Sequence, residues 1–392
     1  MQLFNTITLF LLAVSSTAAF VSNKHISDYV FCLCNYNVQN MNITSNICNL
    51  FSDKLELSCQ DFISNNLNNI NDCNQYLIYN NKISTDKHFN MFSNFIIKFG
   101  NNKKYSSIEN LLDRFYIFKD NMNFIESENL KGHTYTLGST IFADMTNDEY
   151  REILNLQLPK SYCKLKTLSG SFSSGVDWRA KNAVTPVKDQ GYCGSCWSFS
   201  TTGAVEGAYA IRMGTLVSFS EQQLVDCAGS YGNHGCNGGM MDYAFSYIID
   251  NGITLETLYP YTSGDGSSTG VCKPFNPFTK LSGCFDVPAN ELQLTLALAV
   301  QPVSVAIEAD AKSFQLYTSG VYNDPACGTT LDHGVLAAGF GTNTAGQTYY
   351  IVKNSWSTGW GDGGYIYIAR NSVATSTKGI CGIAMQPSYP QV

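Results

Sequence analysis

The chain has 392 residues, of which 44 % are hydrophobic and 14 % are charged, and its formal net charge is −7. This length exceeds a single compact core, so we expect two or more folding units. The apolar content excludes a mainly disordered protein, and the acidic balance argues against nucleic acid as a partner, because nucleic-acid binding needs a basic face. The 14 cysteines fit an oxidising compartment.

Residues 1–19 are predicted to be a signal peptide. Residues 7–14 form a short apolar run, and small residues follow as far as Ala19. The alternatives are a buried N-terminal helix and an uncleaved anchor. No later stretch reaches roughly 18 uninterrupted apolar residues, so no membrane span is expected. If the chain enters the secretory route, Asn42 in Asn-Ile-Thr is a glycosylation acceptor.

Residues 20–86 form an Asn-rich extension to which the sequence assigns no function. Its composition is that of a small disulfide-tied unit or a spacer. Its cysteines are odd in number, so either Cys163 completes the set or one thiol stays free. They are Cys32, Cys34, Cys48, Cys59 and Cys73.

Residues 87–130 carry charged and aromatic residues at helical spacing, which predicts packing helices. Steps of 4, 3, 4 and 4 place five residues on one helix face, namely Arg114, Phe118, Asn121, Ile125 and Asn129. Residues 154–175 show little periodicity, and residues 169–175 are nearly all Ser and Gly. This composition predicts an exposed linker that is open to proteolysis.

The C-terminal part is predicted to have a helical half followed by a β half. Helical patterns occur at 196–213, 220–227 and 240–250. Gly214 ends the first of these helices. From about residue 300 the period shifts toward two, and strands are predicted at Pro302–Glu308, Val335–Phe340, Thr348–Lys353 and Gly364–Ala369.

Cys196 begins the first of these predicted helices. Unpaired N–H groups and the helix dipole favour an anion there, which predicts a stabilised thiolate. A thiolate is the attacking species in cysteine catalysis. The alternatives for Cys196 are a buried apolar residue and a disulfide partner.

His333 is the candidate base for this nucleophile. It precedes the strand at 335–340, and Asn354 follows the strand at 348–353. If these strands form a hairpin about Thr344, residues whose numbers sum to 688 face each other, and His333 lies beside Asn354. The Asn354 amide then holds one imidazole nitrogen and leaves the other for Cys196. A structural role is the alternative for a lone His.

Two further groups complete a candidate site for acyl transfer. The Cys196 N–H and the Gln190 side-chain amide are candidate donors to the developing oxyanion. Trp356, two residues after Asn354, is placed to cover the His–Asn hydrogen bond from water. The alternatives are an ordinary loop residue for Gln190 and a core aromatic for Trp356.

The stretch Pro186–Trp197, which contains Cys-Gly-Ser-Cys-Trp, resembles the active-site segment of papain-like cysteine proteases. In that family the His and Asn follow the Cys at a long interval, and His333 lies 137 residues after Cys196. Residues 235–245 are most similar to the cathepsin L branch. Other matching segments are Val176–Arg179, Cys236–Gly239, Asn354–Trp356 and Gly359–Gly361.

The resemblance implies an α+β papain-like fold over residues 172–392. Its helical domain and its antiparallel, β-barrel-like domain enclose a cleft, and a helical inhibitory prodomain precedes them. It implies a cathepsin L-like cysteine endopeptidase made as a zymogen, with no metal and no organic cofactor. Residues 87–171 then form an inhibitory propeptide with its linker, which blocks the cleft until acid titrates Asp and Glu near pH 4.

The resemblance also assigns disulfides and a substrate cleft. Cys284 has no counterpart in it, and is either free or a competitor of Cys272. The implied disulfides are Cys193–Cys236, Cys227–Cys272 and Cys327–Cys381. The implied substrate-binding residues are Gly238, Gly239, Met240, Met241, Ala306, Leu331, Asp332, Gly334, Trp356 and Gln386. Six of them line a mainly apolar pocket for the residue before P1, namely Met240, Met241, Ala306, Leu331, Gly334 and Gln386.

The implied partners are polypeptide substrates, the chain's own propeptide and cystatin-like inhibitors, and the protein is expected to be a monomer in lysosome-like vesicles or outside the cell. One rival hypothesis is a catalytically inert, disulfide-rich binding or inhibitor homologue. Another is a zinc or thiol-redox module built on Cys193 and Cys196. Zinc needs a second close pair, and Cys227 and Cys236 are nine residues apart.

Overall fold

The computed structural model describes residues 87–100, 105, 108–156, 162–266, 270–370 and 377–392. The chain divides into two compact units, residues 1–119 and 120–392. The predicted signal peptide, the extension at 20–86 with its cysteines, and Asn42 lie outside the described residues.

In the first unit, helix α6 (Lys87–Phe99) and the first half of helix α7 (Ile108–Asn129) carry a cluster of phenylalanine rings. The ring centroids lie 5.2–6.1 Å apart. The rings belong to Phe92, Phe95, Phe99, Phe115 and Phe118. These rings are buried, and Phe118 lies on the predicted helix face. The helices expected over 87–130 are therefore present, and their packing is aromatic.

In the second unit, the residues before the peptidase-like part form an N-terminal arm, defined here as residues 120–171. The arm holds the rest of α7, strand β1 (Tyr135–Leu137), helix α8 (Asn147–Arg151) and strand β2 (Lys164–Leu165). The buried Asn121 side chain donates hydrogen bonds to the carbonyls of Ala143 and Met145, both at 2.9 Å. The face predicted on α7 therefore ties the helix to the loop that precedes α8.

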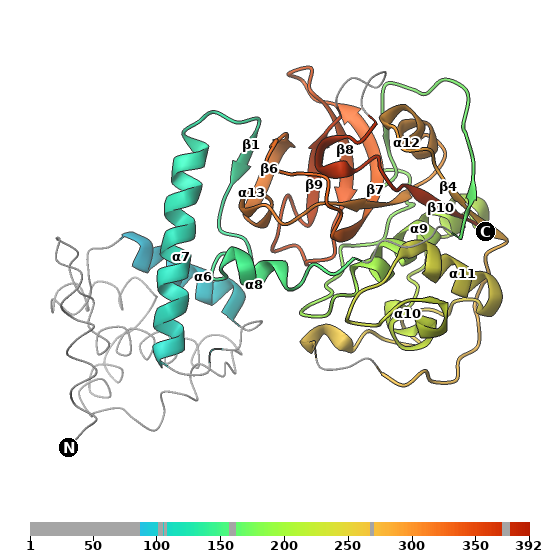
Figure 1. Ribbon diagram of the computed structural model, residues 1–392, viewed down its shortest axis with the longest axis horizontal. Helices are drawn as coiled ribbons and strands as arrows, with labels where there is room; N and C mark the ends of the chain where they lie inside the picture. The colour runs from blue at the N-terminus through green and yellow to red at the C-terminus, as the bar shows by residue number, and fades with distance from the viewer. Residues whose placement is uncertain (1–86, 101–104, 106–107, 157–161, 267–269, 371–376) are drawn as a thin grey trace. The chain divides into compact units, whose positions relative to one another are not determined.

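Three helices pack together after the arm, as Figure 1 shows. They are α9 (Cys196–Met213), α10 (Glu221–Cys227) and α11 (Met241–Asn251), which match the predicted spans to within one residue. Gly214 ends α9 with φ 73°, a left-handed conformation that glycine adopts readily. Shorter helical pieces are η2 (Ala228–Tyr231), η3 (Ser263–Asp265), α12 (Glu291–Leu298), α13 (Lys312–Gln315) and η4 (Ile380–Gly382).

Ten strands of the described chain form one open sheet in the order β1-β6-β9-β8-β7-β5-β10-β4-β2, with β3 paired to β7. The remaining strands are β3 (Val176–Asp177), β4 (Gly283–Asp286), β5 (Val303–Ile307), β6 (Tyr317–Tyr322), β7 (His333–Thr342), β8 (Thr348–Lys353), β9 (Tyr365–Ala369) and β10 (Ser388–Gln391). The expected α+β fold, with helices followed by a sheet, is confirmed. Its sheet is open and not closed into a barrel, and β6–β9 and β2–β4 are parallel pairs.

The register of the β7–β8 hairpin differs from the prediction. Leu336 faces Lys353 and Phe340 faces Tyr350, so the numbers of facing residues sum to 689 or 690 instead of 688. The turn causes a shift of two, because Asn343 N–H bonds the Gln347 carbonyl at 3.0 Å and centres the turn on residue 345. A bulge between Ala337 and Gly339 then reduces the shift to one at Leu336 and Ala337.

Four disulfides cross-link the second unit. Three join the pairs that the resemblance implies, Cys193–Cys236, Cys227–Cys272 and Cys327–Cys381. The fourth, Cys163–Cys284, pairs the two cysteines whose state the sequence left open. Among the described cysteines, Cys196 alone is free.

Candidate active site

Cys196 is the first residue of α9 and is completely buried. The α9 helix packs against β7, which brings the start of that strand to the sulfur. The Gly334 N–H lies 3.4 Å from Cys196 Sγ and donates to it. Since Gly334 follows His333 directly, two segments that are far apart in sequence meet at this thiol.

His333 is held in one orientation by two neighbours. Its Nε2 lies 2.8 Å from Asn354 Oδ1, which fixes Nε2 as the donor because an amide oxygen only accepts. Trp356 stacks on the imidazole, with ring centroids 4.5 Å apart and an interplanar angle of 20°. The other nitrogen, Nδ1, is buried and makes no hydrogen bond to the described residues. Nδ1 is thus left unprotonated, in the tautomer that a base at Cys196 requires.

Burial holds both groups in their neutral forms. It raises the pKa of the Cys196 thiol to about 11, against hydrogen bonds from the backbone of Gly334, Trp197 and Asn155 that lower it. Burial also lowers the pKa of His333 to about 4, while the Asn354 hydrogen bond acts in the opposite direction. The start of α9 predicts a stabilised thiolate, but beneath the arm burial favours the neutral thiol of Cys196. Exclusion of water outweighs the helix terminus here.

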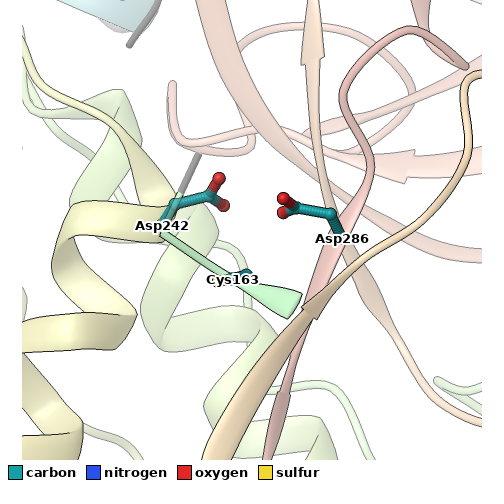
Figure 2. Close-up of side chains that lie close together, drawn as sticks. All are labelled: Cys163, Asp242 and Asp286. Carbon is teal, nitrogen blue, oxygen red and sulfur yellow. The ribbon is translucent and has the colours of Figure 1, made fainter. Parts of the chain in front are cut away.

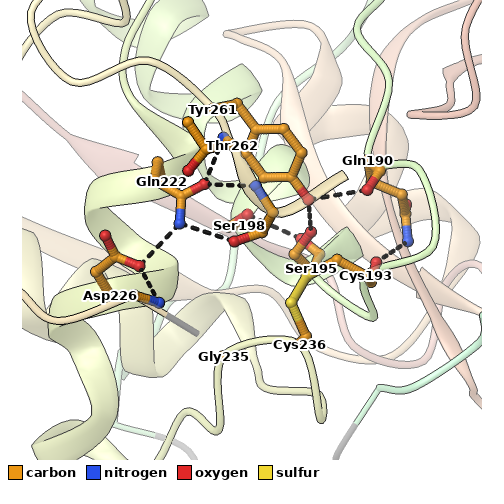
Figure 3. The surroundings of a disulfide bond; sticks show 12 residues. Gln190, Cys193, Ser195, Ser198, Gln222, Asp226, Gly235, Cys236, Tyr261 and Thr262 are labelled. Atoms are coloured by element: carbon orange, nitrogen blue, oxygen red, sulfur yellow. Dashed lines mark hydrogen bonds between the residues drawn. A yellow bond between two sulfur atoms is a disulfide. The ribbon is translucent and has the colours of Figure 1, made fainter. Parts of the chain in front are cut away.

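Gln190 lies on the loop before α9 and is fully buried (Figure 3). Its amide nitrogen donates to the Cys193 carbonyl at 3.0 Å, and its amide oxygen accepts from Ser355 Oγ at 2.6 Å. A primary amide has two N–H hydrogens, so one remains for another acceptor. The Cys193–Cys236 disulfide anchors the same loop, which keeps this amide next to the start of α9.

The N-terminal arm runs through the cleft beside Cys196. Leu156 forms a parallel bridge with Gly239, and its N–H donates to the Asp332 carbonyl at 2.9 Å. The Asn155 backbone N–H faces the Cys196 sulfur. Gly238 makes this approach possible, because a Cβ at this residue would lie 2.4 Å from the Asn155 carbonyl oxygen.

Four of the residues expected in the apolar pocket lie in one buried cluster. Leu156 of the arm packs against this cluster. The four residues are Met240, Met241, Ala306 and Leu331. Gly334 adjoins Met241, because a Cβ at Gly334 would lie 3.2 Å from its sulfur. The Gln386 amide oxygen is buried without a hydrogen bond to the described residues.

The arm also covers the indole of Trp356. Phe142 meets Trp356 edge-on at 5.1 Å, and Tyr150 does so at 5.6 Å. Tyr150 is fixed in turn, because its hydroxyl donates to the Ala309 carbonyl at 2.7 Å. These rings cover Trp356 beside His333, and Leu156 covers the apolar cluster.

Two residues of this region were not predicted from the sequence. The Tyr261 hydroxyl donates to the Gln190 carbonyl at 2.9 Å and lies 2.8 Å from Ser195 Oγ, so it braces the loop that carries Gln190 (Figure 3). Asn155 lies in a segment without periodicity. Neither has a local sequence signal, because each acts only through contacts with distant parts of the chain.

One cluster of the described residues has the composition of a metal site. The ligand atoms of Cys163, Asp242 and Asp286 lie within 4.8 Å of one another (Figure 2). The Cys163 sulfur is bonded to Cys284, so it has no thiolate to offer a metal ion. Two carboxyl groups remain, one on α11 and one on β4.

Comparison with known families places two domains on the chain. The profile described as "Papain family cysteine protease" matches residues 172–391. The profile described as "Cathepsin propeptide inhibitor domain" matches residues 92–150. Among the described residues, no helix combines the length and apolar character needed to cross a membrane.

Individual proteins agree with these matches. The chain is 49 % identical over 300 residues to "Probable cysteine protease RD21C" of Arabidopsis thaliana. The matched region covers 74 % of this chain and 65 % of that protein, so the chain spans slightly less than two thirds of the relative's length. It is 47 % identical to "Cysteine proteinase 3" of Dictyostelium discoideum, over 74 % of this chain and 88 % of that one. A solved structure of digestive procathepsin L 3 from Tenebrio molitor has a TM-score of 0.71 at 41 % identity, and covers 79 % of this chain and all of that one.

Proposed function

Because the chain belongs to the papain family of cysteine proteases, we propose that it is a cysteine endopeptidase of cathepsin L type, made as a zymogen and inhibited by its own N-terminal arm. Two contacts support this proposal: the Gly334 N–H, next to His333, donates to the Cys196 sulfur, and His333 is hydrogen-bonded to Asn354. An inert homologue is not favoured, because the nucleophile, the base and the positioning amide are all present.

In the proposed reaction, His333 Nδ1 takes the proton of Cys196, and the thiolate attacks the carbonyl carbon of the substrate. The Cys196 N–H and the remaining Gln190 amide hydrogen donate to the oxyanion. His333 then protonates the leaving amine, and an acyl-enzyme remains. Water activated by His333 releases the acid and restores the thiol. Asn354 acts throughout by holding Nε2, which keeps Nδ1 directed at the sulfur.

The arm inhibits in two ways in this proposal. It presents an N–H of Asn155 to the sulfur, where a substrate would present a carbonyl carbon. It also excludes water from the thiol and the imidazole, so that neither becomes charged. Removal of the arm then restores solvent to both groups and favours the thiolate–imidazolium pair.

The processing that we propose follows from the same organisation. The linker at 169–175 is cut and the mature enzyme starts near Phe172–Val176, in accord with a family match that begins at residue 172. Entry into the secretory route through residues 1–19 fits the four disulfides. Storage in lysosome-like vesicles or secretion, and glycosylation at Asn42, belong to this proposal.

The proposal is tested on the purified precursor at pH 4–5 with thiol, beside Cys196→Ser. Wild type is expected to shorten itself to roughly 220 residues and to hydrolyse a fluorogenic Phe-Arg peptide. The variant is expected to stay full length and to lose hydrolysis by about four orders of magnitude or more. An inactive wild-type enzyme after complete removal of the arm would contradict the proposal and favour the inert homologue.

The apolar pocket predicts preference for Leu, Val or Phe before P1, since Leu156 of the arm packs against the same cluster. We further propose that the Gln386 amide oxygen, which is buried without a hydrogen bond to the described residues, is the polar acceptor of this pocket. We expect Leu-Arg reporters to be cut faster than Arg-Arg reporters, and Gln386→Ala to reduce the Arg-Arg rate by about tenfold. Equal Arg-Arg rates for wild type and variant would exclude this role of Gln386.

A further inference from the structure

The Cys163–Cys284 disulfide joins two parts of the chain that lie on opposite sides of the linker. Cys163 precedes residues 169–175 and Cys284 follows them, with a separation of 121 residues. We propose that this disulfide keeps the N-terminal arm attached after the linker has been cut, and that its reduction by a dithiol is a separate step in release of the arm. This inference rests on the proposed function, in which the arm is the inhibitor.

Hydrogen bonds hold the same part of the arm along the edge of the sheet. The β2 strand pairs in parallel with β4, and the Lys166 N–H continues this pairing to the Asp286 carbonyl at 2.9 Å. The Gln293 side chain then clamps Leu168, since it accepts from the N–H at 2.7 Å and donates to the carbonyl at 2.9 Å. A cut within 169–175 breaks none of these contacts.

Side chains reinforce this attachment on both sides of the disulfide. Tyr162 meets Tyr243 of α11 edge-on at 5.1 Å. The Lys166 ammonium lies 4.4 Å from the centre of the Phe285 ring. The linker itself is exposed at residues 169–171 and 173–174 and lies outside helices and strands. Residues 164–165 are also exposed, but their backbone is paired with β4, so a protease binds and cuts the unpaired linker more readily.

The attachment lies close in sequence to the residues that fill the cleft. Leu156 is seven residues before Cys163, and seven residues span at most about 25 Å. An inhibitor tethered at this range has an effective concentration on the order of millimolar, so it rebinds and does not leave on dilution. Cutting the linker is therefore not sufficient to open the cleft.

The reductive step is ordinary thiol–disulfide exchange. Cys163 is partly exposed and Cys284 is buried, so a thiolate of a dithiol reductant attacks Cys163 Sγ. A mixed disulfide forms, and Cys284 leaves as a thiolate that takes up a proton. The second thiol of the reductant then attacks the reductant's other sulfur atom, which is bonded to Cys163 in the mixed disulfide. This attack releases Cys163 as a thiol. The reductant is oxidised to a disulfide, and the two cysteines gain two electrons and two protons.

The tether is tested without use of the enzyme's own activity. A recognition sequence for an unrelated protease is inserted into residues 169–175 of the full chain carrying Cys196→Ala. After cleavage, the alkylated protein is run on a denaturing gel with and without dithiothreitol. The two pieces are expected to migrate together without reductant and separately with it. Separation without reductant would overturn the proposal.

The matched control carries Cys163→Ser and Cys284→Ser together, and its pieces are expected to separate without reductant. Peptide mass mapping of the uncut chain checks the pairing directly, whether or not this variant folds. A Cys163–Cys284 peptide is the expected result, and alkylation of both cysteines without reduction would overturn the proposal.

A second readout uses active chains that carry the same insertion, cut in degassed buffer without reductant. Over a 100-fold dilution, the tethered protein is expected to keep a constant low specific activity, while the double Ser variant gains about tenfold or more. Equal gains would overturn retention of the inhibitor. If the chain with its native cysteines stays inactive after cutting and reduction with dithiothreitol, the proposed function fails, while the gel still decides whether the tether exists.

Discussion

The N-terminal arm contacts the peptidase domain in two regions that differ in chemistry. In the first, called here the polar anchor (residues 135–151), the Tyr135 hydroxyl donates to Asp324 at 3.0 Å and Arg151 pairs with Asp310 at 3.1 Å. In the second, the strand anchor (residues 162–168), strand pairing and a disulfide act beside the Asp242–Asp286 carboxyl pair. The polar anchor depends on charged carboxylates, whereas the strand anchor adjoins the Asp242 carboxyl, which favours the protonated form.

The two anchors therefore respond to pH in opposite directions. Burial raises the pKa of Asp324, but hydrogen bonds from Ser313, the Ala326 N–H and Tyr135 outweigh it and leave a lowered value. The stability from Asp324 is present above its unfolded pKa near 4 and is lost as pH falls through the folded value. Burial and the Asp286 charge raise the pKa of Asp242 to about 7, so its contribution is greatest below pH 4 and is lost as pH rises through 7.

This difference explains how the precursor avoids early release. Acid weakens the polar anchor but leaves the strand anchor at its most stable. Thiol reductants cleave the disulfide of the strand anchor, but they act slowly in acid because thiolate is scarce. Neither acid alone nor a thiol reductant alone therefore weakens both anchors efficiently.

The largest expected effect comes from Asp242→Asn in the Cys196→Ala precursor. Between pH 5 and pH 8, the free energy of unfolding of the parent should fall by about 2 kcal/mol because of this carboxyl pair, and the Asn variant should lose that fall. Urea unfolding at the two pH values measures it, with the exposed Asp362→Asn as control. If the Asn variant kept the pH dependence of the parent, the claim that the two anchors respond to pH in opposite directions would be wrong.

A smaller effect is expected from Tyr135→Phe, which removes the hydrogen bond to Asp324 in the polar anchor. The bond is partly exposed, so its loss should weaken the anchor by about 1 kcal/mol, or about fivefold. Self-processing at pH 5 should accelerate by that factor, and its acid limb should move to higher pH. Tyr116→Phe, at an exposed position of α7, is the control. An unchanged rate would show that acid acts elsewhere.

The smallest effect is expected from Gln293→Ala, which removes the clamp on Leu168 in the strand anchor. Two neutral hydrogen bonds are lost while the disulfide remains, so the change should be about 1 kcal/mol or less. Cleavage of the linker by an added protease should quicken by about threefold, without any change in the pH of release. The neighbouring Leu292→Ala is the control. A shift in the pH of release would mean that the two anchors are coupled.

Sequence patterns predicted the elements of this molecule better than its long-range pairings. The α9 span and the β8 span follow from periodicity and from Gly214, because local rules determine where helices and strands end. The predicted β7–β8 register was wrong by one or two residues because alternation does not show that the turn is centred on residue 345 or that β7 contains a bulge. The Cys163–Cys284 pair could not be assigned, since spacing does not determine connectivity over 121 residues.

In the candidate site, too, local patterns were predicted better than long-range contacts. His333 and Asn354 lie side by side despite the register error, because both residues lie at one end of the hairpin. The helix start predicts a stabilised thiolate at Cys196, whereas burial beneath the arm raises the pKa of this thiol to about 11. That Asn155 and Leu156 cover this residue could not be predicted, since they lie in a segment without periodicity.

The position of Trp356 makes the molecule its own optical reporter. Its indole is 2 % exposed and lies between His333 and two rings of the arm, Phe142 and Tyr150. The other three tryptophans are buried as well, at Trp178, Trp197 and Trp360. Departure of the arm removes the Phe142 and Tyr150 rings from the Trp356 indole and exposes it to water, so the emission of the protein should shift to longer wavelength as the arm leaves. Unlabelled precursor in a stopped-flow fluorimeter therefore gives the opening rate without a substrate.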